Sequence, residues 1–137
     1  DPETQVVLPL LQTDLVNIFN AIHHNTLQDL TIEWSNQSAV CIVLASEGYP
    51  GSYEKGKEIH IPAIESENQA IIHAGTKENN NRIITNGGRV LGAIGKSNQL
   101  STAIENAYQI AEKIKFEGKY YRSDIAKKAF RHIQSDT

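Results

Sequence analysis

The sequence contains no methionine, even at position 1, and only one cysteine, Cys41. A single cysteine cannot form a disulfide within the chain, which is typical of proteins from a reducing compartment. No apolar run approaches the ~20 residues that a membrane-spanning helix needs, and the polar, acidic start does not resemble a signal peptide. We therefore expect a cytoplasmic protein. Because the chain begins with Asp-Pro-Glu, we also expect it to be a piece of a longer polypeptide.

Basic residues are too few to suggest a nucleic-acid partner. The 13 Lys and Arg residues against 16 Asp and Glu residues give a net charge of -3, whereas nucleic-acid phosphates favour a basic face. Hydrophobic residues make up 39% of the 137 residues and charged residues 21%, so a folded core is expected. This length suits one domain, or a small domain with part of another.

Three segments have the pattern of helices. Apolar residues recur at helical spacing over residues 9–24, with Pro9 in the first turn and Asn25 and Thr26 at the end. A second helix is predicted over residues 98–114, where leucine, alanine and isoleucine form one face. A short last helix is predicted over residues 123–133, with Ser123 as its N-cap.

The middle of the chain has the pattern of strands. The nearly continuous apolar run at residues 38–46 predicts a strand buried on both faces, and the glycine-rich segment 47–56 after it predicts a loop. Residues 76–81 are polar and predict a turn. Further strands are predicted over residues 30–34, 69–75, 82–86 and 89–94. Helix, strands and helices in this order predict an α+β fold, with a boundary near residue 30.

The sequence holds no complete catalytic set. His60, His73 and His132 are scattered along the chain. His23 and His24 are adjacent on a predicted helix and therefore point in different directions, so no metal site is expected. The glycine runs lack the lysine and hydroxyl of a nucleotide-binding Walker A loop. Cys41 is expected to act as a small hydrophobic residue in its strand.

Two features remain as candidate sites. Lys77 follows one glycine turn, and Arg89 follows Gly87 and Gly88. If the two strands pair, the basic side chains converge beside exposed backbone N–H groups, which suits a phosphate. The alternative is two solvated charges at strand ends. The second feature is the pair of carboxylates at Asp1 and Glu3, which could serve a cation or an amine.

Several motifs together resemble one family. DPETQ, AVCIVLASEGYPGSYEKG, HAGTK, TNGGRVLG and YYRSDIA are similar, in order and spacing, to the C-terminal portion of the phosphoribosylamine–glycine ligases, which are ATP-grasp enzymes. The resemblance implies an enzyme of purine biosynthesis that joins glycine to 5-phosphoribosylamine through glycyl phosphate and releases ADP and phosphate. It also implies that magnesium or manganese accompanies ATP.

The resemblance places the metal ligands and the nucleotide-binding segments before residue 1. We therefore expect no metal site in this chain and no ligase activity from it alone. Residues 1–30 would end an ATP-grasp domain, with Asp1 and Glu3 at the edge of its active site. Residues 31–137 would form a C-terminal domain with a small mixed, barrel-like sheet and flanking helices, similar to that of biotin carboxylase.

The resemblance also implies roles and partners. Lys77 and Arg89 would bind the substrate phosphate, with the bare backbone of Gly87 and Gly88 close to it. The other partners would be glycine, ATP and the remainder of the same chain. The Gly48-Tyr49-Pro50-Gly51 segment is interpreted as a structural turn.

Two alternatives use the same residues. The chain could be a stand-alone phosphate-binding or interaction module. It could also be a biotin or lipoate carrier, with Lys77 as the modified residue, although GTKENNN does not have the pattern of a carrier hairpin.

Overall fold

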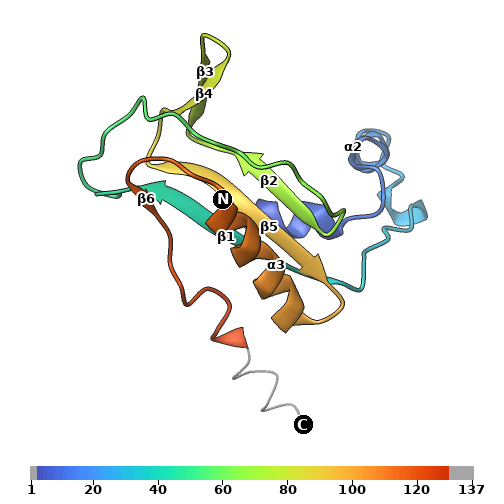
Figure 1. Cartoon of the computed structure of the whole chain (residues 1–137). Coiled ribbons are helices and arrows are strands. Elements are labelled where there is room, and N and C mark those ends of the chain that lie inside the picture. Colours follow the sequence, from blue (N-terminus) through green and yellow to red (C-terminus); the bar gives the residue numbers. More distant parts are fainter. Residues whose placement is uncertain (1–2, 130–137) are drawn as a thin grey trace.

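The structure is a computed structural model that describes residues 3–129. Its centre is a four-stranded sheet in the order β2-β5-β1-β6, with helix α3 on one face and the short helix α1 on the other (Figure 1). A separate two-stranded hairpin, β3–β4, projects from one end of this sheet. The sheet strands are β1 (Ser38–Ser46), β2 (Gln69–His73), β5 (Arg89–Ser97) and β6 (Lys119–Tyr120).

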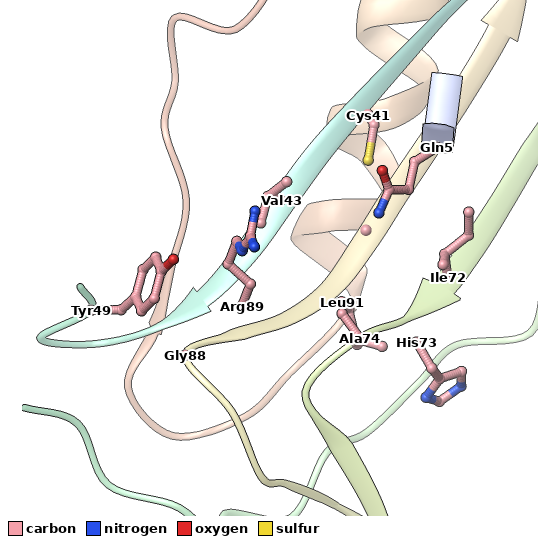
Figure 2. A pocket seen from close by; sticks show the side chains of 11 residues that line it. Gln5, Cys41, Val43, Tyr49, Ile72, His73, Ala74, Gly88, Arg89 and Leu91 are labelled. Carbon is pink, nitrogen blue, oxygen red and sulfur yellow. The ribbon is translucent and has the colours of Figure 1, made fainter. Parts of the chain in front are cut away.

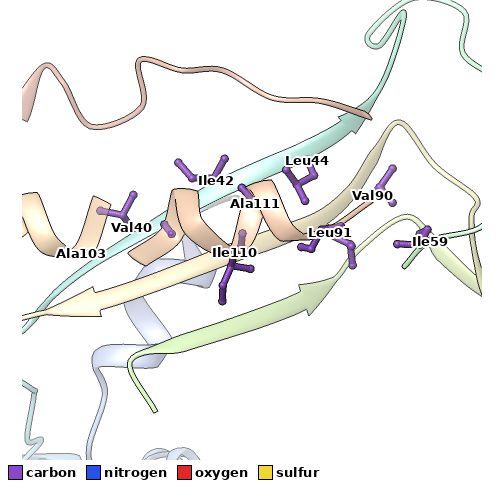
Figure 3. Packing of buried hydrophobic residues seen from close by; sticks show 12 residues of the cluster. Val40, Ile42, Leu44, Ile59, Val90, Leu91, Ala103, Ile110 and Ala111 are labelled. Carbon is purple, nitrogen blue, oxygen red and sulfur yellow. The ribbon is translucent and has the colours of Figure 1, made fainter. Parts of the chain in front are cut away.

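The hydrophobic core lies between α3 (Leu100–Lys113) and the sheet (Figure 3). Gly95 on β5 lets the helix approach closely, because a Cβ there would collide with the backbone of Ala103 and Ala107. The predicted helix over residues 98–114 is confirmed. Its small and branched apolar residues pack against alternate residues of β1 and β5; the fully or almost fully buried ones include Ile42, Leu44, Ala93, Ala103, Ala107, Ile110 and Ala111.

Strand β1 has the predicted bounds, but the expectation that both its faces are buried is wrong. Val40, Ile42 and Leu44 point toward α3 and are at most 4% exposed. Cys41 and Val43 point to the other face and are only half-buried. That face therefore has space beside it, and the continuous apolar run does not reveal this.

The segment predicted as a turn, residues 76–81, is mostly strand. β3 (Thr76–Asn79) pairs with β4 (Arg82–Thr85), and only Asn80 and Asn81 connect them. Both asparagines have positive φ, at 49° and 61°, as a two-residue hairpin turn requires. The prediction missed β3 because its residues are polar and mostly exposed.

The N-terminal segment contains three short helices instead of the single helix predicted over residues 9–24. α1 (Thr4–Val7) and a 3-10 turn (Leu8–Leu10) come before α2 (Leu15–His23). α2 begins where Asp14 caps it, since the carboxylate accepts from the N–H of Val16 at 2.7 Å. Asn25, with φ of 56°, ends it as predicted.

Two other element predictions fail or fall partly outside the described residues. Residues 30–34 form no strand; one isolated bridge joins Leu11 to Trp34, after a 3-10 turn at Leu27–Asp29. Residues 124–128 are turn and coil, with a single helical residue at position 129. The rest of the helix predicted over residues 123–133 lies outside the described residues.

The α+β class is confirmed, but the sheet differs from the one expected. All strand pairs within residues 3–129 are antiparallel, and the four-stranded sheet is open, with β2 and β6 at its edges. The expected mixed, barrel-like arrangement is therefore not observed. In the same residues, no helix is long and apolar enough to cross a membrane.

Lys119 closes the C-terminal end of α3. Its ammonium donates to the carbonyl oxygens of Ala111 at 2.8 Å and Ile114 at 2.7 Å, and it lies 5.2 Å from the ring centre of Tyr121. Burial lowers the pKa of Lys119. These bonds satisfy carbonyls that a helix end otherwise leaves without partners.

We therefore predict that Lys119→Met lowers the free energy of unfolding by about 1 to 2 kcal/mol, measured by urea denaturation. Lys113→Met is the matched control, since Lys113 is an exposed lysine in the last turn of the same helix. If the two variants lose equal stability, general charge at the helix end is responsible and not the bonds of Lys119.

Candidate functional site

A pocket of about 490 Å³ lies on the sheet face opposite α3 (Figure 2). Its floor is the half-buried side of β1 and β5, where Val43 pairs with Gly92. Helix α1 and the loop after β1 contribute to its walls. The polar side chains that line it are Gln5, Tyr49, His73 and Arg89.

Arg89 reaches this pocket because of an irregularity in the sheet. Leu44 pairs with Leu91 and the next residue of β1, Ala45, pairs with Arg89, so Val90 is an extra residue in β5. A bulge of this kind changes the face on which the following side chain lies. Val90 is fully buried in the core, while Arg89 lines the pocket. Regular alternation would have placed Arg89 on the side of α3.

The two glycines before Arg89 form a turn that is held from both sides. Ser46, at the end of β1, donates from its N–H to the carbonyl of Gly88 at 2.8 Å and from its hydroxyl to that of Gly87 at 3.2 Å. The N–H of Gly75 donates to the carbonyl of Arg89 at 2.8 Å. The carbonyls of this turn are therefore occupied, and its position relative to β1 is fixed.

The N–H groups of the same turn, in contrast to its carbonyls, make no hydrogen bonds with the described residues. Within residues 3–129, no group accepts a hydrogen bond from the N–H of Gly87 or Gly88. Gly88 lines the pocket. Backbone donors beside a guanidinium form an arrangement that suits an anion.

Tyr49 covers Gly88. A Cβ at Gly88 would lie 2.6 Å from Cε2 of Tyr49, so only glycine leaves room for the ring. Tyr49 follows Gly48, whose φ is 91°, and its ring lies 6.1 Å from that of Tyr53. The peptide bond between Tyr49 and Pro50 is cis. The loop predicted as a plain turn thus also forms one wall of the pocket.

The other residues predicted as functional lie elsewhere. Lys77 is exposed on β3 and is not among the residues that line the pocket. Glu3 is exposed at the start of α1, where a hydrogen bond with its own backbone lowers the pKa of its carboxyl group. Asp1 lies outside the described residues.

Cys41, which was expected to act only as a small hydrophobic residue, lines the pocket, and burial raises the pKa of its thiol.

Three of the polar side chains that line the pocket were not expected from the sequence: Gln5, Tyr49 and His73. The glycines on both sides of Tyr49 were the available signal, since they mark a loop with a demanding backbone. Gln5 gave no signal, because α1 is too short for a helical pattern. Among residues 3–129, no group of three or more histidine, cysteine, aspartate or glutamate side chains could hold a metal ion.

The sequence and the fold are similar to those of known proteins. The C domain of phosphoribosylglycinamide synthetase matches residues 39–128 as a family model. A solved structure, that of phosphoribosylamine–glycine ligase from Thermotoga maritima, matches 92% of this chain with a TM-score of 0.72 and 40% identity. The chain belongs to the phosphoribosylglycinamide synthetase family, whose C domain it contains.

Relatives of known sequence agree with this assignment. Phosphoribosylamine–glycine ligase from Caldanaerobacter subterraneus is 47% identical over 92% of the chain, and the bifunctional purine biosynthetic protein purD of Dictyostelium discoideum is 49% identical over 98%. The chain spans only 30% of the first relative and 17% of the second. It covers 31% of the Thermotoga structure.

The contact between Tyr49 and Gly88 can be tested by a double-mutant cycle. We predict that Gly88→Ala destabilises the chain by about 1 to 3 kcal/mol, because the added methyl group overlaps the ring. In the background of Tyr49→Ala, the same change should cost at least about 1 kcal/mol less. Urea denaturation of the four proteins measures both values. Equal costs in the two backgrounds would show that the ring does not occupy this space.

Proposed function

We propose that the chain is the C-terminal part of a ligase that joins glycine to 5-phosphoribosylamine with hydrolysis of ATP, and that its pocket binds the phosphate of 5-phosphoribosylamine. The observation that carries this proposal is that Arg89 and Gly88 line one pocket, while the N–H groups of Gly87 and Gly88 donate to no group within residues 3–129. The names of the relatives supply the reaction.

The chemistry of the turn favours a phosphate. A guanidinium presents several N–H donors in a fixed plane, which match the oxygens of a phosphate. Backbone N–H groups of glycine add donors without a side chain that would hold the ligand away. The carbonyls of the turn, which would repel an anion, are already bound to Ser46 and Gly75.

Lys77 is a second candidate for the phosphate site. It lies two residues after Gly75, whose backbone contacts Arg89 and Gly87. Its exposed ammonium therefore adds positive charge on the hairpin next to the turn. A direct contact with the phosphate would require the side chain to reach from β3 toward the pocket, so we expect a smaller contribution than that of Arg89.

The nucleotide and its magnesium or manganese would be held by another part of the enzyme. The described residues contain no group of three or more histidine, cysteine, aspartate or glutamate side chains that could hold a metal ion. Asp1 and Glu3 would lie at the edge of that active site. By the same reasoning, residues 1–137 alone would have no ligase activity.

Helix α2 supports the idea that more of the polypeptide packs on this chain. Val16, Phe19 and Ile22 lie on one side of α2 and are 62%, 58% and 53% exposed. No residue of α2 is buried, and Figure 1 shows the helix standing apart from the sheet. We propose that this face packs against the preceding ATP-grasp portion of the enzyme and is buried there, with a domain boundary near residue 30.

We predict that Arg89→Ala in the full-length enzyme raises the apparent KM for 5-phosphoribosylamine roughly tenfold to a hundredfold, because a charged hydrogen bond is lost. The apparent KM for ATP should barely change. Arg82→Ala is the control, since Arg82 is exposed on the adjacent hairpin and pairs with Glu58 at 3.0 Å. Steady-state kinetics with each substrate varied provide the measurement. An unchanged KM for 5-phosphoribosylamine in the Arg89 variant would refute the phosphate site.

We also predict that Phe19→Ala has different effects in two settings. In residues 1–137 it should change the free energy of unfolding by less than about 0.5 kcal/mol, because the ring is exposed. In the full-length enzyme it should destabilise by about 3 kcal/mol, because the ring is covered there. Asn17→Ala, on an exposed polar residue of α2, is the control. Similar small effects of Phe19→Ala in both proteins would mean that the face stays uncovered.

A further inference from the structure

Gln5 is the one polar side chain that α1 contributes to the pocket. Its Oε1 atom is buried and has no hydrogen-bond partner among residues 3–129. Leaving a buried acceptor without a donor is unfavourable, and such groups in folded proteins are uncommon. Sites that bind a ligand are a common place for them, because the ligand supplies the missing partner.

The described residues around Gln5 supply no strong donor for this oxygen. The pocket wall on its side is formed by Cys41, Val43 and Ile72, and of these only the thiol of Cys41 has a hydrogen to donate, weakly. Figure 2 shows the amide directed from α1 toward the pocket, with its oxygen on the side of Cys41. The amide nitrogen lies on the side away from Cys41, and because the last torsion of a glutamine is broad, a half-turn exchanges the positions of the nitrogen and the oxygen.

The distance between the two polar ends of the pocket suits a small sugar phosphate. Cys41 lies beside Gln5, and Ala45 pairs with Arg89. These two residues of β1 are four positions apart, which corresponds to about 13 Å along a strand. In Figure 2 the side chain of Arg89 extends from its end of the pocket toward Val43, which shortens the remaining gap.

We propose that Gln5 determines which phosphate esters the pocket accepts, by forming a hydrogen bond with a hydroxyl group of a pentose 5-phosphate whose phosphate lies at Arg89. This inference rests on the proposed function, because it assumes the phosphate site. It adds a residue that recognises the sugar. The apolar wall between the two ends then contacts the carbon atoms of the ring, and inorganic phosphate makes only the contacts at the turn.

The experiment uses residues 1–137 and two probes, ribose 5-phosphate and inorganic phosphate, with dissociation constants from isothermal titration calorimetry. We expect ribose 5-phosphate to bind more tightly to the wild type. Gln5→Met keeps the length of the side chain and removes the amide, and it should weaken the binding of ribose 5-phosphate roughly three- to tenfold. The dissociation constant of inorganic phosphate should stay unchanged, which would show that the pocket is intact. Gln109→Met, on the exposed side of α3, should change neither constant.

The results separate this inference from the proposed function. If the wild type binds both probes and Gln5→Met leaves their ratio unchanged, the role of Gln5 is refuted and the phosphate site stands. If Gln5→Met weakens both probes equally, Gln5 supports the fold of the pocket and does not recognise the sugar. If the wild type binds neither probe, the phosphate site and the role of Gln5 are both wrong.

Discussion

The extra residue in β5 is the feature on which the rest of the site depends. Val90 has no partner of its own opposite Leu44 and Ala45, and it turns inward to join the core. Its neighbour Arg89 consequently lies on the opposite face, at the pocket. Packing and function are thus coupled, because the burial of one apolar side chain sets the direction of the charged one before it.

Glycines then keep that face of the sheet accessible. A Cβ at Gly92 would lie 2.9 Å from Sγ of Cys41, and a Cβ at Gly75 would lie 2.6 Å from the carbonyl oxygen of Arg89. Gly88 leaves room for the ring of Tyr49. Side chains at these positions would fill the floor of the pocket or push the turn away from β1. Gly92 therefore leaves part of the pocket floor without a side chain.

Much of the fold follows from local pattern, and most of the site does not. The nearly continuous apolar run of β1 and the helical spacing of α3 predict both elements, because each must bury apolar side chains. The bulge at Val90 leaves no trace in that pattern, since valine suits a strand in either register. The glycines before Arg89 identified it as a candidate site residue, but the sequence did not show on which face of the sheet its side chain lies. Gln5 and Tyr49 enter the site through tertiary packing of a short helix and a loop, which no local periodicity records.

The proposed phosphate site requires that an anion bind at the N–H groups of Gly87 and Gly88 beside Arg89. The most direct measurement is a titration of ¹⁵N-labelled residues 1–137 with inorganic phosphate, followed by amide chemical shifts in NMR. We predict that the largest saturable shifts occur at Gly87, Gly88 and Arg89, while the amide signals of α3 on the opposite face do not shift. Saturable shifts centred elsewhere, or no shift at these glycines at high phosphate concentration, would contradict it.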